Sequence, residues 1–434
     1  MQVQKPREIA LRVLRRRAQG REFVERLLDA EFDATPLSPA DRGLCREIAL
    51  GCVRWERTLD WLIARRTDGR PQKPSLQILL RLGLYQVFWL DRVPDHAAVH
   101  ETVELARQCG FAPQSGFVNA VLRSCLRERE DVTRDLAALR TRHPAVGYSH
   151  PDWLWDRWQA RYGMEAATRL MEWDNTPPPT FARLNALKTN AALLLERWRL
   201  TEGVEYDLFR RDWCGENLVF ELKNHPPLSR LGSFRDGWFY VQDPSTLLAV
   251  SLLNAQPGEA VLDLCAAPGG KTTFIAQLQA DKGTILACDN DPSRLRLLGD
   301  NVRRLGATSI TPQLLDRGWP AALGVRQFAR VLVDAPCSNT GVLRRRVDLR
   351  WRLHPDEPAR MARSQQALLD LAAPRVAPGG TLVYSTCSLE PEENENVLRT
   401  FLDRYRHFRL DTARAITPME DGVDGAFAAR LVAG

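Results

Sequence analysis

The sequence predicts an all-helical N-terminal domain followed by an α/β domain whose mostly parallel sheet is doubly wound. Up to about residue 145, apolar residues recur at the three- and four-residue spacing of amphipathic helices. From residue 236 on, short β-branched runs alternate with helical stretches, as in a parallel sheet with helices on both faces. The chain of 434 residues exceeds one ordinary domain. We therefore expect three parts, residues 1–145, 146–235 and 236–434.

The first part contains seven stretches with helical spacing, separated by proline and glycine breaks. Ser38 and Asp95 stand where helix N-caps are expected. The stretches are residues 9–16, 23–32, 44–55, 59–66, 76–90, 97–108 and 116–126. We expect about seven helices here. The second part mixes short helical pieces with a strand over residues 180–187, which indicates a small α+β linking region.

Positive charge is concentrated in the N-terminal third. Residues 1–150 carry 25 Lys and Arg against 19 Asp and Glu, and this excess of six equals the net charge of the whole chain. Most of it is arginine, which makes planar, bidentate contacts with phosphate. Both a nucleic-acid partner and a solvated basic surface are compatible with the pattern.

Other features argue against several classes of protein. The chain has no run of 18 apolar residues and no secretory signal at its start, so we expect a cytoplasmic protein with no membrane partner. Its nine cysteines have no regular spacing, so we expect free thiols instead of a disulfide framework. No cysteine or histidine pattern has zinc spacing, and we expect no metal.

The first strand of the α/β part, residues 260–264, leads into the glycine-rich turn DLCAAPGGKTT. A phosphate-binding P-loop would require glycine at the position of Cys265. A nucleoside cofactor would require an acid after the next strand, and Asp289 stands there, 20 residues after Gly269. A plain strand-to-helix turn is the third alternative. The residues of the turn are Cys265, Ala266, Ala267, Pro268, Gly269, Gly270 and Lys271.

Two later strands each end in a cysteine. In RVLVDAPCSNTG the strand ends at Asp334 and is followed by Cys337; in TLVYSTCSLEPEENE it runs into Cys387 and then into a very polar segment. A thiol at the carboxyl end of a strand is accessible to substrate and lies near helix N-termini, which favour a thiolate. A buried structural thiol is the alternative at each position.

In this order, DLCAAPGGKTT, the acid of CDNDPSRL, DAPCSNTG and YSTCSLEPEENE resemble the motifs of the RNA cytosine-C5 methyltransferases. They are most similar to the bacterial 16S rRNA branch called RsmB, also known as Sun or Fmu. Residues 1–145 resemble the NusB-like RNA-binding domain of that branch, and FARLNALKTN and GWFYVQDPSTLL resemble its linking region. The resemblance implies a Rossmann-like methyltransferase sheet, S-adenosylmethionine as cofactor, 16S ribosomal RNA as substrate and a monomer.

The resemblance also implies roles for individual residues. Cys387 would be the nucleophile that adds to C6 of cytosine, and Cys337 would assist release of the methylated RNA. Chemistry alone does not rank the two cysteines, because related DNA methylases use the cysteine that follows proline. Asp334 would hydrogen-bond the N3 and N4 edge of the base and lie beside the cofactor, and Lys271 would face the active site. The cofactor would contact residues 265–271, with Asp289 on the ribose. Asp316, at the end of the third strand, would touch the adenine or else lie in a surface turn.

Three further expectations concern surface and edge positions. A basic cluster with one aromatic residue follows Cys337 and suits a flipped-out base with its flanking phosphates. It consists of Arg344, Arg345, Arg346, Arg350, Trp351 and Arg352. His354 has no assigned role, and the C-terminal strand in GAFAARLVAG should pack at the sheet edge. A methyltransferase for tRNA or 23S rRNA, a P-loop NTPase and a non-catalytic RNA-binding protein remain as alternatives.

Overall fold

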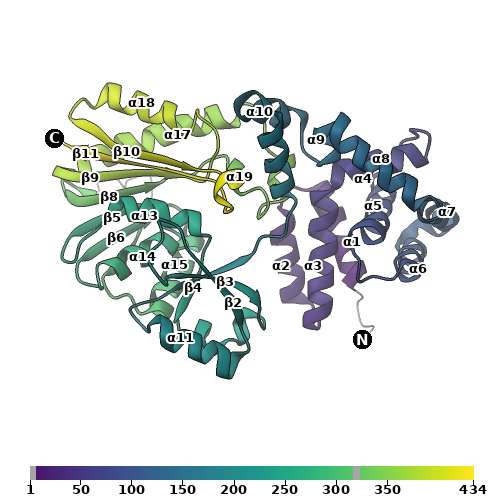
Figure 1. Ribbon diagram of the computed structural model, residues 1–434, viewed down its shortest axis with the longest axis horizontal. Coiled ribbons are helices and arrows are strands. Elements are labelled where there is room, and N and C mark those ends of the chain that lie inside the picture. Colours follow the sequence, from purple (N-terminus) through teal and green to yellow (C-terminus); the bar gives the residue numbers. More distant parts are fainter. Residues whose placement is uncertain (1–5, 316–322) are drawn as a thin grey trace. The chain divides into compact units, whose positions relative to one another are not determined.

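The computed structural model describes residues 6–315 and 323–434. The chain forms two compact units (Figure 1). The helical unit comprises Met1–Pro177 and Leu343–Pro355, and the sheet unit comprises Pro178–Val342 and Asp356–Gly434. These two units do not test the predicted boundaries at residues 145 and 235, so the division into three parts stays a prediction. Among the described residues, no helix is long and apolar enough to span a bilayer.

All seven predicted helices are present in the helical unit, as α1 to α7. The helices are α1 (Pro6–Gln19), α2 (Val24–Ala34), α3 (Pro39–Arg54), α4 (Glu56–Arg66), α5 (Pro74–Trp89), α6 (Asp95–Ala106), α7 (Ser115–Arg127), α8 (Arg129–Arg142), α9 (Pro144–Gly147) and α10 (Asp152–Asp174). The estimate of about seven helices before residue 145 omitted α8. Only Val132 and Leu139 of α8 are buried, so its apolar stripe is too sparse to recognise in the sequence.

The two predicted N-caps have different outcomes. The Ser38 hydroxyl accepts a hydrogen bond from the Asp41 N–H at 3.1 Å, so this cap is confirmed. The prediction for Asp95 is wrong, because Pro94 occupies the cap position and Asp95 is the first helical residue. Its carboxylate accepts a hydrogen bond from Arg129 instead of closing the helix end.

The segment Leu343–Pro355, which follows the loop of Cys337, belongs to the helical unit. Arg344 is buried and its guanidinium lies 3.8 Å from the ring centroid of Trp173. Arg350 is fully buried and donates to the Asp174 carbonyl oxygen at 2.9 Å. The prediction that this cluster meets RNA is therefore wrong for these two arginines, because their guanidiniums are used inside the protein.

Trp351 and Arg352 are anchored in the same way. The Trp351 indole N–H donates to the Val53 carbonyl oxygen at 2.8 Å. Arg352 donates to the carbonyl oxygens of Arg21 and Glu22, each at 2.6 Å. These contacts join the segment to α3 and to the loop between α1 and α2, which precede it by about 300 residues in the chain. The sequence pattern could not reveal them.

The sheet unit begins with a small antiparallel sheet in the order β2-β3-β1-β4. Its strands are β1 (Thr180–Leu184), β2 (Glu205–Phe209), β3 (Val219–Asn224) and β4 (Phe239–Val241). The short helices α11 (Ala191–Arg197) and α12 (Gly232–Arg235) belong to the same part of the chain. The predicted strand after Pro179 is β1.

The main sheet has seven strands in the order β10-β11-β9-β8-β5-β6-β7. They are β5 (Ala260–Leu264), β6 (Thr284–Asp289), β7 (Ile310–Leu314), β8 (Phe328–Asp334), β9 (Val376–Thr386), β10 (Phe408–Ile416) and β11 (Ala426–Ala433). All neighbours pair in parallel except β11, which is antiparallel to both β9 and β10. The predicted doubly wound, mostly parallel sheet is confirmed.

The C-terminal strand corrects one expectation. β11 is not at the sheet edge but lies between β9 and β10, and β10 forms the edge. Phe427, Ala429 and Leu431 of β11 are buried in the core on one face of the sheet. The small residues of this strand therefore pack inside the sheet.

Helices cover both faces of the main sheet (Figure 1). One face packs against α13 (Leu247–Leu253), α14 (Gly270–Leu278) and α15 (Pro292–Leu305), and the other packs against α17 (Glu357–Ala372) and α18 (Glu395–Arg404). Successive strand residues alternate between the two cores, as Val261 and Leu262 do. A last short helix, α19 (Pro418–Asp421), precedes β11.

Candidate active site

The candidate site lies at the carboxyl ends of the central strands. The strand order of the main sheet reverses between β5 and β8, and ligands of doubly wound sheets bind in the crevice at such a switch point. The glycine turn follows β5, Asp334 ends β8, and Cys387 follows β9. Because these strands are parallel neighbours, the sheet brings the predicted residues of three separate loops to one edge.

The two cysteines are in contact. The Cys337 and Cys387 sulfur atoms are 3.3 Å apart, and all nine cysteines of the chain are free thiols. The Cys387 thiol is partly exposed, whereas Cys337 is 8% exposed. The hydrogen bond with Cys387 and burial both raise the pKa of Cys337. At neutral pH, Cys337 is therefore held as a neutral thiol beside the more accessible Cys387.

Asn339 organises this pair, and its importance was not recognised in the sequence. Its side-chain oxygen accepts a hydrogen bond from the Cys387 thiol at 3.1 Å. Its side-chain amide donates to the Cys337 carbonyl oxygen at 2.6 Å. Asn339 has a φ of 60°, a left-handed conformation that Asn tolerates better than most residues. The sequence feature that could have indicated this role is the Ser-Asn pair that directly follows Cys337.

Lys271 and Asp334 form an ion pair next to the thiols. The Lys271 ammonium lies 2.7 Å from one Asp334 carboxylate oxygen, and the Ser385 hydroxyl donates to the other at 2.8 Å. Burial lowers the pKa of Lys271, but the Asp334 charge raises it, and the net direction is upward. The ammonium therefore remains charged, and Cys387 makes a smaller contribution that also raises its pKa.

The glycine turn is held by the acid that follows β6. One carboxylate oxygen of Asp289 accepts from the Ala267 N–H and the other from the Asp291 N–H, each at 3.1 Å. A carboxylate offers about four lone-pair sites, so acceptor capacity remains for ribose hydroxyls. A Cβ at Gly270 would lie 3.1 Å from the Tyr240 ring, so a larger residue there would require that ring to shift. The turn fits a nucleoside cofactor, and Asp316 lies outside the described residues.

Asp263, in strand β5, is a buried acid that the sequence interpretation passed over. It is fully buried and accepts a hydrogen bond from the Thr272 hydroxyl at 2.7 Å. Its other carboxylate oxygen has no hydrogen-bond partner within the described part of the chain. Burial raises the pKa of Asp263 to about 7. The sequence feature that could have drawn attention to Asp263 is its position in DLCAAPGG, two residues before the turn.

We expect Asp263→Asn to become more stabilising as pH rises. The wild-type fold keeps a proton on Asp263 between roughly pH 4 and pH 7 that the unfolded chain has lost, so its stability falls across this window. The variant lacks this titration. Its advantage in free energy of unfolding should grow by up to roughly 4 kcal/mol between pH 4 and pH 7 and then level off. Urea denaturation at several pH values measures it.

Asp281→Asn is the control of opposite sign. Although burial opposes it, hydrogen bonds from Ser309 and Thr308 lower the pKa of Asp281. The stability from this carboxylate is present at neutral pH and lost as pH falls, so the control should be destabilising at pH 7 and close to wild type in acid. A pH-independent difference for Asp263→Asn would contradict a raised pKa.

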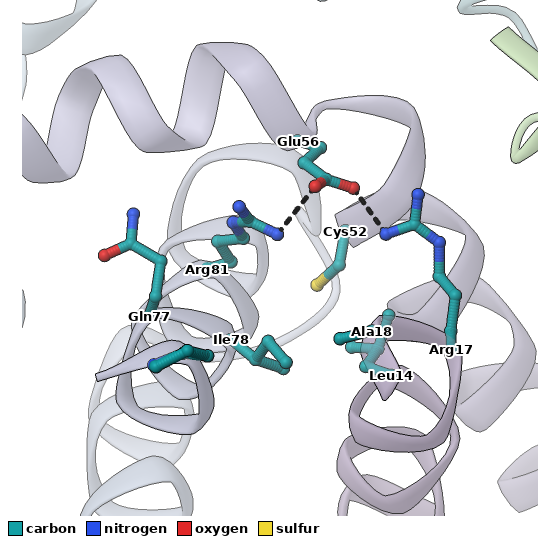
Figure 2. A pocket seen from close by; sticks show the side chains of 9 residues that line it. Leu14, Arg17, Ala18, Cys52, Glu56, Gln77, Ile78 and Arg81 are labelled. Carbon is teal, nitrogen blue, oxygen red and sulfur yellow. Dashed lines mark hydrogen bonds and ion pairs between the residues drawn. The ribbon is translucent and has the colours of Figure 1, made fainter. Parts of the chain in front are cut away.

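A pocket of about 260 Å³ in the helical unit lies apart from this chemistry. Figure 2 shows Glu56 between the guanidiniums of Arg17 and Arg81, at 2.6 and 3.0 Å. Both arginines also bind a second carboxylate, Asp348 for Arg17 and Asp60 for Arg81. Both positive charges that line the pocket are therefore already paired with carboxylates of the protein. Across residues 6–315 and 323–434, no group of three or more acidic, cysteine or histidine side chains could hold a metal.

The strand order with one reversed strand, the glycine turn after β5 and the acid after β6 define an S-adenosylmethionine-dependent methyltransferase. Models of protein families match along the chain. The 16S rRNA methyltransferase RsmB/F family matches residues 250–432. The NusB family matches residues 4–127, and the ferredoxin-like domain of RsmF/B-like methyltransferases matches residues 150–208.

Individual relatives cover nearly the whole chain. The probable ribosomal RNA small subunit methyltransferase B of Bacillus subtilis (strain 168) is 36% identical over 93% of this chain and 90% of its own length. The protein of the same name from Synechocystis is 38% identical over 95% and 92%. The crystal structure of PH0851 superposes with a TM-score of 0.78 at 25% identity, over 99% of this chain and 100% of that one. The chain belongs to the RsmB family, and the NusB-like resemblance of its N-terminal region is confirmed.

Proposed function

We propose that this enzyme transfers a methyl group from S-adenosylmethionine to C5 of a cytosine in 16S ribosomal RNA, through a covalent adduct between Cys387 and C6. The observation that supports it most directly is the pair of thiols 3.3 Å apart at the switch point of the sheet. The relatives are named small subunit rRNA methyltransferases, which supports the RNA.

The residues at the β5 and β6 ends suit the cofactor. Residues 265–270 would surround it, and Asp289 would accept hydrogen bonds from its ribose hydroxyls. Lys271 and Asp334, joined at 2.7 Å, would lie where this turn meets the thiols. When bound, S-adenosylmethionine supplies an electrophilic methyl group, which C5 of the base accepts.

The protein side chains make C5 reactive. C5 of cytosine is a poor nucleophile, and addition of the Cys387 thiolate to C6 turns the C5–C6 double bond into an enamine whose electron pair is available at C5. Asp334 would hydrogen-bond the N3 and N4 edge and balance the changing charge of the ring. The Lys271 ammonium favours the thiolate form of Cys387.

Release reverses the addition. The C5 proton leaves to a base, its bonding electrons restore the C5–C6 double bond, and the C6–S bond breaks to return the Cys387 thiolate. We assign the base to Cys337. In the adduct Cys387 is bonded to C6, so the hydrogen bond that contributes most to the raised pKa of Cys337 is lost; its own proton can then pass to water and the thiolate can accept the C5 proton. Its contact with Cys387 at 3.3 Å supports this assignment, because a base next to Cys387 would lie on the side of the ring that carries the adduct.

Two alternative functions have less support than the proposed one. A P-loop NTPase lacks the first glycine of its motif, since Cys265 stands there. A non-catalytic RNA-binding protein leaves the thiol pair and the Lys271–Asp334 ion pair without a purpose. A cytosine of tRNA or 23S rRNA remains the alternative substrate. That the protein is cytoplasmic and monomeric stays a prediction.

Bisulfite sequencing of ribosomal RNA tests the reaction and the substrate together. Cells without this protein should lose protection of one cytosine in 16S rRNA, and the purified enzyme with S-adenosylmethionine should restore it. Protection restored only in tRNA or 23S rRNA would point to the alternative substrate. Methylation at a position other than C5 would contradict the proposal.

We expect Cys337→Ala to trap the RNA. Without the release base, Cys387 should still add to C6 and C5 should still be methylated, so the adduct accumulates as a protein–RNA band on denaturing gels while turnover stops. The double variant Cys337→Ala/Cys387→Ala is the matched control and should give no band. A band that survives loss of Cys387 would mean that the roles of the cysteines are wrong.

A further inference from the structure

The polar segment after Cys387 is not a solvated loop, because one of its acids is fully buried. Glu393 is 0% exposed and accepts four hydrogen bonds. Two come from the backbone N–H and the hydroxyl of Ser338, the first at 2.8 Å. The others come from the Ser388 hydroxyl at 2.7 Å and the Gln365 side-chain amide at 3.0 Å. Four donors satisfy a buried carboxylate that would otherwise be costly.

Two of these partners stand directly after the two thiols in the chain. Ser338 follows Cys337 and Ser388 follows Cys387, and their hydroxyls are themselves 3.1 Å apart. One carboxylate therefore joins the loop after β8 to the loop after β9. The ladder between these strands ends at Asp334 and Ser385, so it does not extend to the cysteines.

The backbone around Glu393 is fixed in turn. The Tyr384 hydroxyl donates to the Glu393 carbonyl oxygen at 2.6 Å. The Asn394 side chain accepts from the Thr386 hydroxyl at 2.6 Å and donates to the Ser388 carbonyl oxygen at 2.9 Å. These contacts come from both sides of Cys387, so they hold the backbone of Glu393 and Asn394 against the strand end that carries the thiol.

We infer that Glu393 is a positioning residue that sets the separation of the two active-site thiols by holding Ser338 and Ser388 on one carboxylate. It touches no reacting atom. The importance of this spacing for catalysis rests on the proposed function, whereas the spacing itself does not. A reaction in which two protein side chains act on one nucleobase is sensitive to the distance between those side chains. A shift of about 1 Å can lower the rate on the order of 10²-fold.

The rate at which Cys337 and Cys387 form a disulfide tests the inference without RNA. Diamide accepts the two electrons and two protons that a pair of thiols loses on forming a disulfide, and the rate of the Cys337–Cys387 product, measured by peptide mass, reports their juxtaposition. Glu393→Ala should slow this rate and kcat by about 10²-fold while the S-adenosylmethionine dissociation constant stays within about twofold. Glu393→Gln, which keeps the acceptor for the two serine hydroxyls, should lie between the variant and wild type.

Glu395→Gln is the matched control, an exposed acid two residues further on, and should behave as wild type. Thiol pairing at the wild-type rate in Glu393→Ala overturns the inference. If that variant does not fold, Glu393→Gln decides, and a wild-type pairing rate there overturns it. If the wild-type thiols pair but the Cys337→Ala variant never traps RNA, the proposed function is refuted and the positioning role stays intact.

Discussion

Cys387→Ala should abolish methyl transfer, lowering kcat on the order of 10⁴-fold or more. The proposed chemistry begins with addition of this sulfur to C6, and Cys387 is the partly exposed member of the thiol pair. The neighbouring Cys337 is not a substitute, because it is buried and its raised pKa keeps it protonated. Transfer of labelled methyl groups to 16S rRNA measures the loss.

Binding should survive the same change. The thiol is directed to the base and not to the glycine turn, so S-adenosylmethionine should bind with a nearly unchanged dissociation constant. Cys214→Ala is the matched control, since Cys214 is also partly buried and belongs to the same unit. It should keep wild-type activity. Retention of more than a few per cent of activity by Cys387→Ala would remove this cysteine from the nucleophile role.

The sequence predicted the central fold because its signals there are local. Buried strands and amphipathic helices alternate from β5 to β9 except at β7, where only Ile310 is buried, and each of the others is recognisable without its neighbours. β10 was missed for a physical reason, since this edge strand buries only its ends, Phe408 and Ile416. The interior place of β11 depends on pairing with β9 and β10, which no local pattern encodes.

The candidate site likewise contains residues that the sequence could reveal and residues that it could not. The glycine turn, Asp289, Asp334 and the two cysteines stand at strand ends, so topology alone brings them together. Glu393 was overlooked because a carboxylate in a run of polar residues normally indicates a solvated loop. Its burial is possible only because Ser338 and Gln365, from other parts of the chain, supply donors.

Long-range burial also explains why the prediction of RNA contact is wrong for Arg344 and Arg350. Arginine with tryptophan after a reactive cysteine is compatible with RNA binding, but it is equally compatible with anchoring a segment in a protein core. Buried Asp348 lies at the centre of that segment and accepts hydrogen bonds from Arg17 at 2.7 Å and from the Val24 N–H at 3.0 Å. Charge pattern alone cannot distinguish the two uses.

Asp348 supplies what helix α2 lacks in its own sequence. The N-cap residue of α2, Phe23, offers no side-chain acceptor, so the first N–H of the helix would be unpaired without this carboxylate. An anion at a helix N-terminus is further stabilised by the helix dipole. Arg352 completes the site with an ion pair at 3.0 Å. Asp348 thus fastens the segment that begins six residues after Cys337 to the start of α2.

We therefore expect Asp348→Ala to lower the free energy of unfolding of the helical unit by about 3 to 5 kcal/mol, the usual cost of removing one partner of a buried ion pair. Asp135→Ala is the matched control. Asp135 also pairs with an arginine, Arg65 at 2.6 Å, but both side chains are exposed, so its loss should cost about 1 kcal/mol or less. Calorimetric unfolding transitions of the two variants make the comparison. Equal effects would contradict the anchoring role, because the two ion pairs differ chiefly in burial and in the backbone N–H that only Asp348 satisfies.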